Sequence, residues 1–357
     1  MDKYWIGLSS IEELSSSFIL RLYNHFGNIE QAFCANDLSA IDGLSVAKAE
    51  KFMRLRDKVD LDKALEAVQS RGINYLTFDD DRYPQMLRNI YDAPAVLYYK
   101  GDLFDCNLDR TLAVVGSRRA TSYAKDALSK IISELIDTDI CVVSGLASGI
   151  DTIAHTSSIN NNLKTIGVIA SGFDFTYPTA NKDLYRKIEE GCGAVVSEYY
   201  PTFQPLQFRF PQRNRIVSGL SYGTLVAEAS LKSGALITAN LTLEQGRELM
   251  CIPGLITNPN TQGIYKLLKN GATLVTCADD ILSALDWEVK LEQKTLFDLD
   301  LSNDEKLIYE ALEIEDKCFD ELQAFTRLSV DNLLMYLTTM ELKGIIKQVD
   351  GDRYRKI

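Results

Sequence analysis

Apolar residues recur at the spacing of an α-helix over the first 65 residues of the chain. The clearest stretch is residues 8–26. A second stretch, residues 38–55, has the same spacing on both sides of a tight turn at Gly43-Leu44-Ser45, which predicts a helix, a turn and another helix. The pattern therefore predicts a small helical domain over residues 1–65.

Between residues 66 and 285 the pattern changes to short apolar strands that alternate with helices. Continuous Val, Ile and Ala runs of this kind are typical of a parallel sheet that is buried on both faces. This predicts an α/β fold, with an extended Rossmann-like, doubly wound and mostly parallel sheet over residues 66–285, in which ligands bind beyond the carboxyl ends of the strands. The predicted strands are INYLTF, AVLYYKG, LAVV, ICVV, TIGVIA, GAVVSEY, GTLVAEAS, LMCIPG and TLVTC.

The last part of the chain has a third pattern. Residues 286–303 show no sustained period and are predicted to be a linker. Residues 304–357 contain three helical stretches and then a strand pair that turns at residues 350–352, Asp-Gly-Asp. Three helices followed by a hairpin predict a winged-helix-like domain.

The third helix of this domain is the one that would enter a DNA major groove. It carries Asp331 and Glu341 and has no Lys or Arg before Lys343. Negative charge on this face should repel DNA. We therefore interpret the tail as a protein-contact or regulatory module.

The composition narrows the class of protein. No run of 18 apolar residues exists, so no transmembrane helix is expected, and the N-terminus lacks the basic and apolar regions of a secretion signal. The 7 cysteines have no CxxC spacing, which predicts reduced thiols in a cytoplasmic protein and no zinc site. Two histidines, His25 and His155, argue against a His-rich metal centre.

The charge is distributed unevenly. The net charge is −12, yet 15 basic and 15 acidic residues lie between Leu112 and Leu282, so the acidic excess belongs to the two ends. No Asp or Glu occurs from Tyr199 to Gly223, a window that contains Arg209, Arg213 and Arg215 beside Phe208 and Phe210. Such a basic window in an acidic chain indicates an anion site, and the aromatic residues, with Tyr177, could stack bases.

Three small-residue turns follow predicted strands. They are Gly116-Ser117-Arg118-Arg119, Ser144–Gly149 and Ser171-Gly172, whose amides and following helix N-termini could approach a phosphate. Any one of them could instead be a tight strand–helix connection, but the three turns together with the arginine window favour a phosphate-rich ligand. The full GxGxxG pattern and a Walker A motif are missing, which disfavours a nicotinamide cofactor and nucleotide hydrolysis.

Two features leave a catalytic alternative open. Asp151 and His155 stand at positions i and i+4 of a predicted helix and could form an acid/base pair, although a capping Asp and a packed His are commoner. Glu228, at the end of a predicted strand, could be catalytic or could orient the arginines.

Seven motifs over residues 72–285 resemble, in order, those of the DNA-processing protein A family (DprA, also called Smf). The most specific are FPQRNRIVSGLS and the following EASLKSGALITA. The resemblance implies a protein without enzymatic activity that binds single-stranded DNA in natural transformation, protects incoming strands and loads the recombinase RecA. It also implies an extended Rossmann fold, a homodimer formed through that domain, and no need for a metal or nucleotide cofactor.

The helical front and the winged-helix-like tail are similar to accessory domains of this family. The front resembles a SAM or helix-hairpin-helix domain, whose turn amides can hold a DNA phosphate. The usual second glycine of that turn is replaced by Ser45, and a plain helical packing domain fits the residues equally well.

The resemblance and the turns together predict the DNA-binding residues. One departure is Ser148, where the family usually has Arg, and Arg119 or Lys164 could compensate for the missing charge. The predicted site comprises Gly116, Ser117, Arg118, Arg119, Ser144, Gly145, Gly149, Lys164, Ser171, Gly172, Phe210, Arg213, Asn214, Arg215, Lys232, Ser233 and Gly234.

An enzyme of the related Rossmann group that cleaves nucleotide N-glycosidic bonds is the alternative. Those lysine decarboxylase-like enzymes carry a PGGxGTxxE run. This chain has SGLSYGTLVAE instead, and the missing Pro-Gly-Gly disfavours the enzyme hypothesis.

Overall fold

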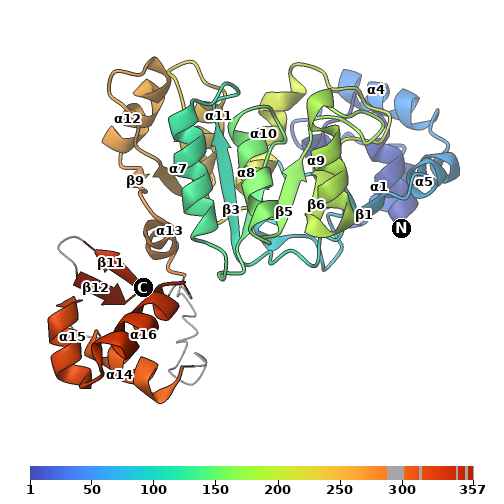
Figure 1. Cartoon of the computed structure of the whole chain (residues 1–357). Coiled ribbons are helices and arrows are strands. Elements are labelled where there is room, and N and C mark those ends of the chain that lie inside the picture. The colour runs from blue at the N-terminus through green and yellow to red at the C-terminus, as the bar shows by residue number, and fades with distance from the viewer. Residues whose placement is uncertain (288–300, 313–315, 343–344, 350–352, 357) are drawn as a thin grey trace. The chain divides into compact units, whose positions relative to one another are not determined.

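The computed structural model describes the whole chain except residues 288–300, 313–315, 343–344, 350–352 and 357. The chain divides into two units, Met1–Glu288 and Val289–Ile357, which are described separately (Figure 1). Most of the predicted linker, residues 288–300, lies outside the described residues. The finer division of the first unit at residue 65 stays a prediction.

The N-terminal part of the first unit is helical, as predicted. Ser15 caps the second helix by accepting a hydrogen bond from Phe18 N (3.3 Å), and Gly27 ends it in the left-handed conformation (φ 66°). The helix expected near residues 38–42 is replaced by turns, with Ile41 N donating to Leu38 O and Leu44 N to Ile41 O. The helices are α1 (Asp2–Ser9), α2 (Ser16–Phe26), α3 (Ile29–Cys34), α4 (Val46–Arg56) and α5 (Leu61–Gln69).

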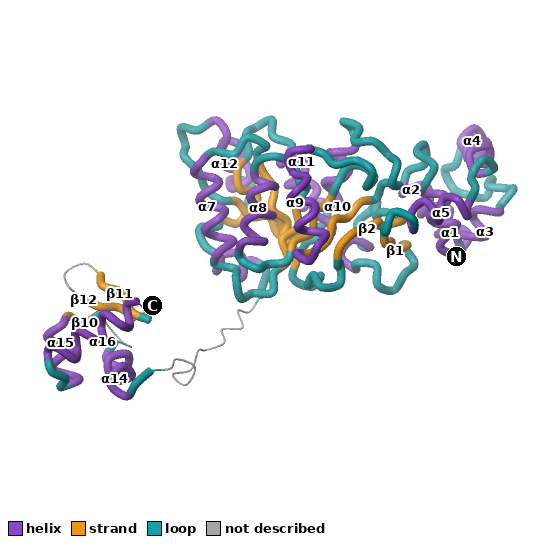
Figure 2. The backbone as a smooth tube through the Cα atoms, turned by 45° about the vertical axis from the view of Figure 1, so that its right-hand side comes forward, coloured by secondary structure: helices purple, strands orange, loops and turns teal. Residues whose placement is uncertain are grey.

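A nine-stranded sheet forms the centre of the first unit, in the order β1-β2-β6-β5-β4-β3-β7-β8-β9. Its strands are drawn in orange in Figure 2. The pairs β1–β2 and β2–β6 are antiparallel and the other pairs are parallel, so the predicted mostly parallel sheet is confirmed. The strands are β1 (Asn74–Thr77), β2 (Val96–Gly101), β3 (Thr111–Gly116), β4 (Cys141–Ser144), β5 (Thr165–Val168), β6 (Gly193–Ser197), β7 (Gly223–Glu228), β8 (Glu248–Cys251) and β9 (Thr273–Leu274).

Helices cover both faces of this sheet, and alternate residues of β3 face the two sides. Leu112 and Val114 pack in one apolar core with residues of α7, α8 and α13. Ala113 and Val115 pack in the other, with residues of α10, α11 and the N-terminal helices. The helices are α6 (Gln85–Arg88), α7 (Ser122–Ser133), α8 (Ile150–Asn160), α9 (Lys182–Lys187), α10 (Arg209–Gly219), α11 (Ala235–Glu244), α12 (Gln262–Lys269) and α13 (Ala278–Ala284).

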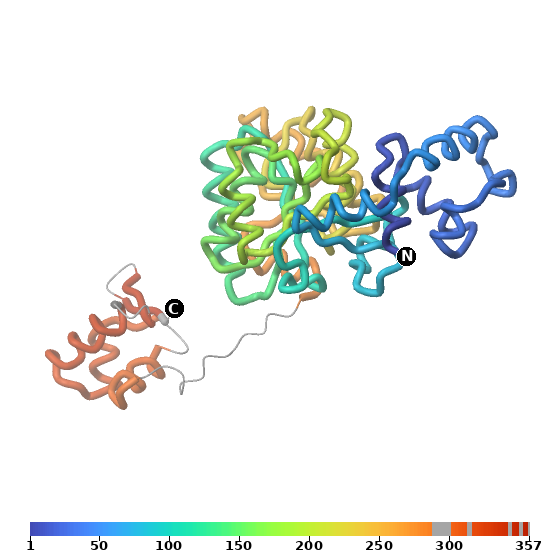
Figure 3. The backbone as a smooth tube through the Cα atoms, turned by 90° about the vertical axis from the view of Figure 1, so that its right-hand side faces the viewer, coloured from blue at the N-terminus to red at the C-terminus, as the bar shows by residue number. Residues whose placement is uncertain are grey.

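The N-terminal helices lie at one side of the sheet-containing part, where they appear in dark blue in Figure 3. Their core is continuous with that of the sheet: Trp5 and Ile19 belong to the same apolar cluster as Leu97 and Val196. The helical front is therefore packed against the Rossmann-like part within one unit.

The second unit has its own apolar core, which includes Ile308, Leu322, Leu333 and Met340. Its elements follow the predicted order of three helices and a strand pair, with one further short strand, and the sheet order is β10-β12-β11. The winged-helix assignment itself stays a prediction. The elements are α14 (Asn303–Ala311), β10 (Lys317–Cys318), α15 (Phe319–Thr326), α16 (Val330–Leu342), β11 (Ile346–Val349) and β12 (Arg353–Lys356).

Two residues used to interpret the tail are exposed on α16. Asp331 and Glu341 face solvent, and Glu341 Oε1 accepts a hydrogen bond from Gln348 N (3.1 Å). Lys343 and the predicted turn at residues 350–352 lie outside the described residues. None of the helices in the described part of the chain is long and apolar enough to cross a membrane.

Candidate nucleic-acid interface

A cavity of about 940 Å³ lies beyond the carboxyl ends of β3 and β4. This is where a doubly wound sheet offers a ligand site. Its walls are the turns after those strands, the first half of α10 and the start of α11. Ten predicted site residues line it: Gly116, Ser117, Arg118, Arg119, Gly145, Phe210, Arg213, Asn214, Ser233 and Gly234.

One exposed group in this cavity combines a cation with two aromatic rings. The Arg118 guanidinium lies 5.6 Å from the centroid of the Phe210 ring. The Tyr177 and Phe210 centroids are 5.3 Å apart in an edge-to-face arrangement, and the Tyr177 side chain is half exposed. A guanidinium beside exposed rings can bind a phosphate while the rings stack on bases.

The turn after β3 is held from within the protein. Ser117 N donates to Glu228 O (2.8 Å), and the Glu228 carboxylate accepts from Thr121 N (3.2 Å) and Thr121 Oγ1 (2.8 Å) at the start of α7. Glu228 therefore occupies the helix N-terminus that we expected to face a phosphate. Its role is to hold this turn, which is neither the catalytic role nor the orientation of the arginines considered from the sequence.

The turn after β4 also contains an internal carboxylate. Asp151 Oδ2 accepts from Gly145 N (3.1 Å) and Ala147 N (3.3 Å). Burial raises the pKa of Asp151 above its usual value, while the Arg213 guanidinium and these amides oppose that effect. The amides predicted to bind a phosphate therefore bind the Asp151 side chain.

Gly149 joins these two turns. Its φ is 81°, and a Cβ atom there would collide with the Ser117 carbonyl oxygen, so glycine is required at this point. The next amide, Ile150 N, donates to Ser117 O (3.1 Å). Gly149 does not line the cavity, but it allows the two turns that do line it to lie against each other.

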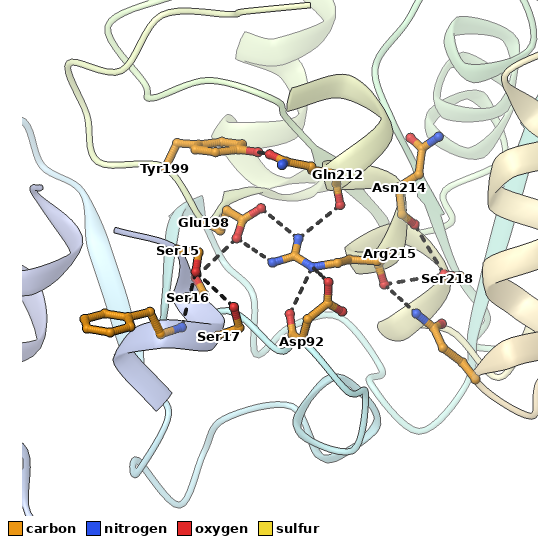
Figure 4. A network of polar contacts seen from close by, with 12 residues as sticks. Ser15, Ser16, Ser17, Asp92, Glu198, Tyr199, Gln212, Asn214, Arg215 and Ser218 are labelled. Carbon is orange, nitrogen blue, oxygen red and sulfur yellow. Dashed lines mark hydrogen bonds and ion pairs between the residues drawn. The ribbon is translucent and has the colours of Figure 1, made fainter. Parts of the chain in front are cut away.

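The three arginines of the basic window are buried. Arg213 Nη1 donates to Gly145 O (2.5 Å) and to Val168 O, and desolvation lowers the pKa of Arg213, although Asp151 opposes this. Arg215 is paired with Glu198 and Asp92 (Figure 4), and Arg209 with Glu12. Of the three arginines, only Arg213 lines the cavity, and its guanidinium binds the protein's own carbonyl groups. Arg215, which was also predicted to bind DNA, is instead buried and paired with Glu198 and Asp92.

The other predicted residues lie outside the cavity lining. Ser144 is buried and donates to Val114 O (2.6 Å). Ser171 is buried too, and the amide of the next residue, Gly172 N, donates to Phe203 O (2.8 Å). Lys232 is exposed beside the cavity residue Ser233.

Lys164 immediately precedes β5, so it lies at the opposite end of the strands from the cavity. It pairs with Asp105 and donates to Gly191 O (2.9 Å). Ser148 is exposed in the turn after β4. Of the two residues considered as compensation for Ser148, only Arg119 lies at the cavity.

Several lining residues were absent from the predicted site. Some of them could have been found from their position in the sequence. Gln207 and Pro211 lie beside the arginines of the basic window, and Ser230 follows a strand. Asn260 comes from a distant turn and had no such signal. The additional residues are Val115, Ala147, Asp151, Tyr177, Pro205, Gln207, Pro211, Val217, Ser230, Ala235, Ile237, Thr238 and Asn260.

Asp151 and His155 have separate partners and do not form the acid/base pair considered above. The Thr165 hydroxyl donates to Val142 O (2.7 Å), so His155 Nδ1 donates to Thr165 Oγ1 (2.7 Å). His155 is fully buried, and its Nε2 has no hydrogen-bond partner among the described residues. Burial, with a smaller contribution from Arg213, lowers the pKa of His155 to about 3.

This histidine should make folding sensitive to acid. Its folded pKa of about 3 lies below the unfolded value of about 6.5, so protonation favours the unfolded chain and stability falls as the pH drops below 6.5. We expect this group to cost about 2 kcal/mol more at pH 5 than at pH 7. Urea unfolding at both pH values should show a smaller acid loss for His155→Asn, which keeps a donor toward Thr165.

The exposed His25 supplies the control. His25→Asn should retain the wild-type loss between pH 7 and pH 5. If His155→Asn retained it too, the acid sensitivity would come from other groups.

Among the residues that the structure describes, no three His, Cys, Asp or Glu side chains are grouped so that they could hold a metal ion. The groups that the cavity does present are the exposed cations Arg118 and Arg119 and the aromatic rings of Phe210 and Tyr177. Such a site suits a phosphate-containing ligand with exposed rings.

Comparison with known proteins identifies similar chains. Residues 74–286 match the family model of DNA recombination-mediator protein A. The chain is 39% identical over 276 residues to DNA processing protein DprA of Streptococcus pneumoniae, covering 77% of this chain and 95% of that one. It is 30% identical over 391 residues to protein Smf of Synechocystis, covering 99% and 98% of the two chains.

Two solved structures are similar to the fold. The X-ray structure of DprA from Streptococcus pneumoniae has a TM-score of 0.69 and 35% identity, and it covers 79% of this chain and 98% of that chain. DNA processing protein A from Helicobacter pylori, whose structure addresses its single-stranded DNA binding mode, has a TM-score of 0.54 and 29% identity. That match covers 60% of this chain and 95% of that one.

Proposed function

The chain belongs to the DNA recombination-mediator protein A family, as its motifs predicted, and we propose that it binds single-stranded DNA without sequence preference. The observation that carries the proposal is the exposed group of Arg118, Phe210 and Tyr177 in the cavity. The relative from Helicobacter pylori, with its described single-stranded DNA binding mode, supports single-stranded DNA as the ligand.

The bound strand would meet two kinds of group. Arg118, Arg119 and Lys232 are exposed and would attract phosphates, and the rings of Phe210 and Tyr177 would stack on bases. Stacking on an aromatic side chain contributes about 1–3 kcal/mol per base and tolerates any base. The cavity amides already bind Asp151, so in this proposal the side chains make the main contacts.

On this basis we propose a recombination mediator rather than an enzyme. The protein would protect incoming strands in natural transformation and load the recombinase RecA on them in the cytoplasm. The N-glycosidase alternative is not favoured, because Glu228, its candidate catalytic carboxylate, is 1% exposed and holds Thr121. The relatives are named as DNA processing proteins, which supports the mediator.

We also propose a homodimer formed through the Rossmann-like domain. Support comes from exposed apolar side chains at the last strands of the sheet: Leu255 and Ile256 follow β8, Leu274 lies on β9, and they are 61%, 83% and 50% exposed. The tail of residues 304–357 would serve as a protein-contact or regulatory module.

The salt dependence of binding tests the proposal. Anisotropy titrations of a labelled oligo-dT should show affinity that falls steeply with salt. Arg118→Gln should make the log–log salt slope shallower by about 0.7, the value for one lost contact with a single-strand phosphate.

Lys130→Gln is the control and should leave the slope unchanged. Lys130 is an exposed cation near the C-terminal end of α7, away from the cavity. No binding by the wild-type protein would refute single-stranded DNA binding. A slope near zero would refute the phosphate contacts.

A further inference from the structure

The two aromatic rings of the cavity stand on segments that are tied to the N-terminal helical part: Phe210 on the first turn of α10 and Tyr177 on a loop. Phe210 is the second residue of α10, directly after Arg209. Tyr177 lies on the loop that follows Ser171-Gly172 and contains Asp174. Arg209 and Asp174 each form an ion pair with a residue from the first 71 positions.

The first tie is between Glu12 and Arg209. Glu12, in the connection between α1 and α2, accepts from Arg209 Nη2 at 2.5 Å, and the Arg209 side chain is 3% exposed. Its guanidinium also lies 4.8 Å from the Tyr199 centroid and 5.1 Å from that of Phe203. Arg209 is thus held among aromatic rings and is paired with a carboxylate of the N-terminal part.

The second tie is between Arg71, in the turn after α5, and Asp174. Arg71 Nε and Nη2 donate to the two Asp174 carboxylate oxygens at 2.8 and 3.0 Å. Asp174 N in turn donates to Pro201 O (3.0 Å), and Tyr200 OH donates to Ala64 O (3.0 Å). The loop that carries Tyr177 and the loop that leads into α10 are therefore fastened to each other and to the end of the N-terminal helical part.

A third contact reaches the middle of α10 through Glu198. Ser16 Oγ, at the start of α2, donates to Glu198 Oε2 (3.3 Å), and Glu198 binds Arg215 through both carboxylate oxygens (Figure 4). Contacts from the N-terminal helices thus reach the first residue of α10 directly and its middle through Glu198.

We propose that Glu12 and Arg71 are positioning residues for single-stranded DNA binding, through which the N-terminal helical part sets the spacing of Phe210 and Tyr177. This inference rests on the proposed function. Neither residue lines the cavity, so they act through Arg209 and Asp174. The two rings contact each other edge to face, so displacing either ring disturbs the surface on which a base would stack, while the exposed cations stay in place.

The experiment separates stacking from charge. Anisotropy titrations compare a labelled oligo-dT with an abasic oligonucleotide of equal length, on Glu12→Gln, Arg71→Asp and Arg71→Asp/Asp174→Arg. We expect each single variant to bind oligo-dT about fivefold more weakly, because part of the stacking is lost. Binding to the abasic strand and the salt slope should stay at wild-type values, and the double variant should recover its affinity for oligo-dT.

Lys3→Gln is the matched control, since it removes another exposed ion pair of the same helices, Lys3–Asp62 (3.3 Å). Thermal unfolding of each variant shows that the comparison concerns folded protein. Arg71 and Asp174 are both about one-third exposed, so the charge exchange provides a test even if Glu12→Gln does not fold.

Unchanged oligo-dT binding in both single variants would overturn the inference, and so would an equal loss for the two oligonucleotides. These outcomes leave single-stranded DNA binding intact. If the wild-type protein fails to bind oligo-dT, the proposed function itself falls.

Discussion

Arg215→Ala should lower the free energy of unfolding by about 3–5 kcal/mol, the cost of leaving one partner of a buried ion pair uncompensated. Arg215 and Glu198 are 9% and 8% exposed, and their closest atoms are 2.6 Å apart. Burial alone would lower the pKa of Arg215, but Glu198 and Asp92 outweigh it and hold that pKa above its ordinary value. Urea unfolding monitored by circular dichroism measures the loss.

Two further variants test whether this loss comes from the buried charge. Arg215→Met/Glu198→Gln removes both charges of the buried pair and should recover part of the stability, while Asp92, 45% exposed, is left to solvent. Arg186→Ala breaks an exposed pair with Asp183 and should cost less than about 1 kcal/mol. A loss for Arg215→Ala as small as that of Arg186→Ala would show that water reaches the pair.

Arg118→Ala/Phe210→Ala should weaken oligo-dT binding about 100-fold, because it removes one charge-assisted phosphate contact and one stacking ring. Arg118 is exposed and Phe210 is partly exposed, so the melting temperature should change little. Arg213→Ala would be a poorer test, since Arg213 also binds the carbonyl groups of Gly145 and Val168 and its loss would disturb the fold.

The chain contains a matched control for this double variant. Arg82 lies 5.6 Å from the centroid of the Phe104 ring, the same separation as Arg118 and Phe210, but neither residue lines the cavity. Arg82→Ala/Phe104→Ala should leave the dissociation constant unchanged. Equal losses in the two double variants would contradict a site at the strand ends.

The fold was largely predictable because burial on both faces leaves a strong trace in a strand. Leu112 to Val115 are all apolar, and the structure buries them alternately in two cores, as a parallel sheet between helical layers requires. The antiparallel edge of β1 and β2 leaves no comparable trace. The direction of a strand is set by its connections, which a short apolar pattern does not encode.

The site was less predictable, because residue type shows which groups could bind an anion but not which of them the protein neutralises itself. The acid-free window around Arg209 and Arg215 suggested free cations, yet their partners Glu12 and Glu198 come from outside it. Asp151 and Glu228 likewise reach back to amides of earlier turns. Lys164 is different: it precedes its strand, so sequence position alone could have excluded it from the carboxyl end.

The place of β3 in the sheet has a consequence for the synthesis of the protein. Its two neighbours are β4, which begins at Cys141, and β7, which begins only at Gly223. At 5–20 residues per second, the ribosome needs about 6 to 22 s to proceed from Gly116 to Glu228. During this time one edge of an apolar strand has no native partner, and such an edge can pair with other chains. The nascent chain is therefore most vulnerable to aggregation before β7 is made.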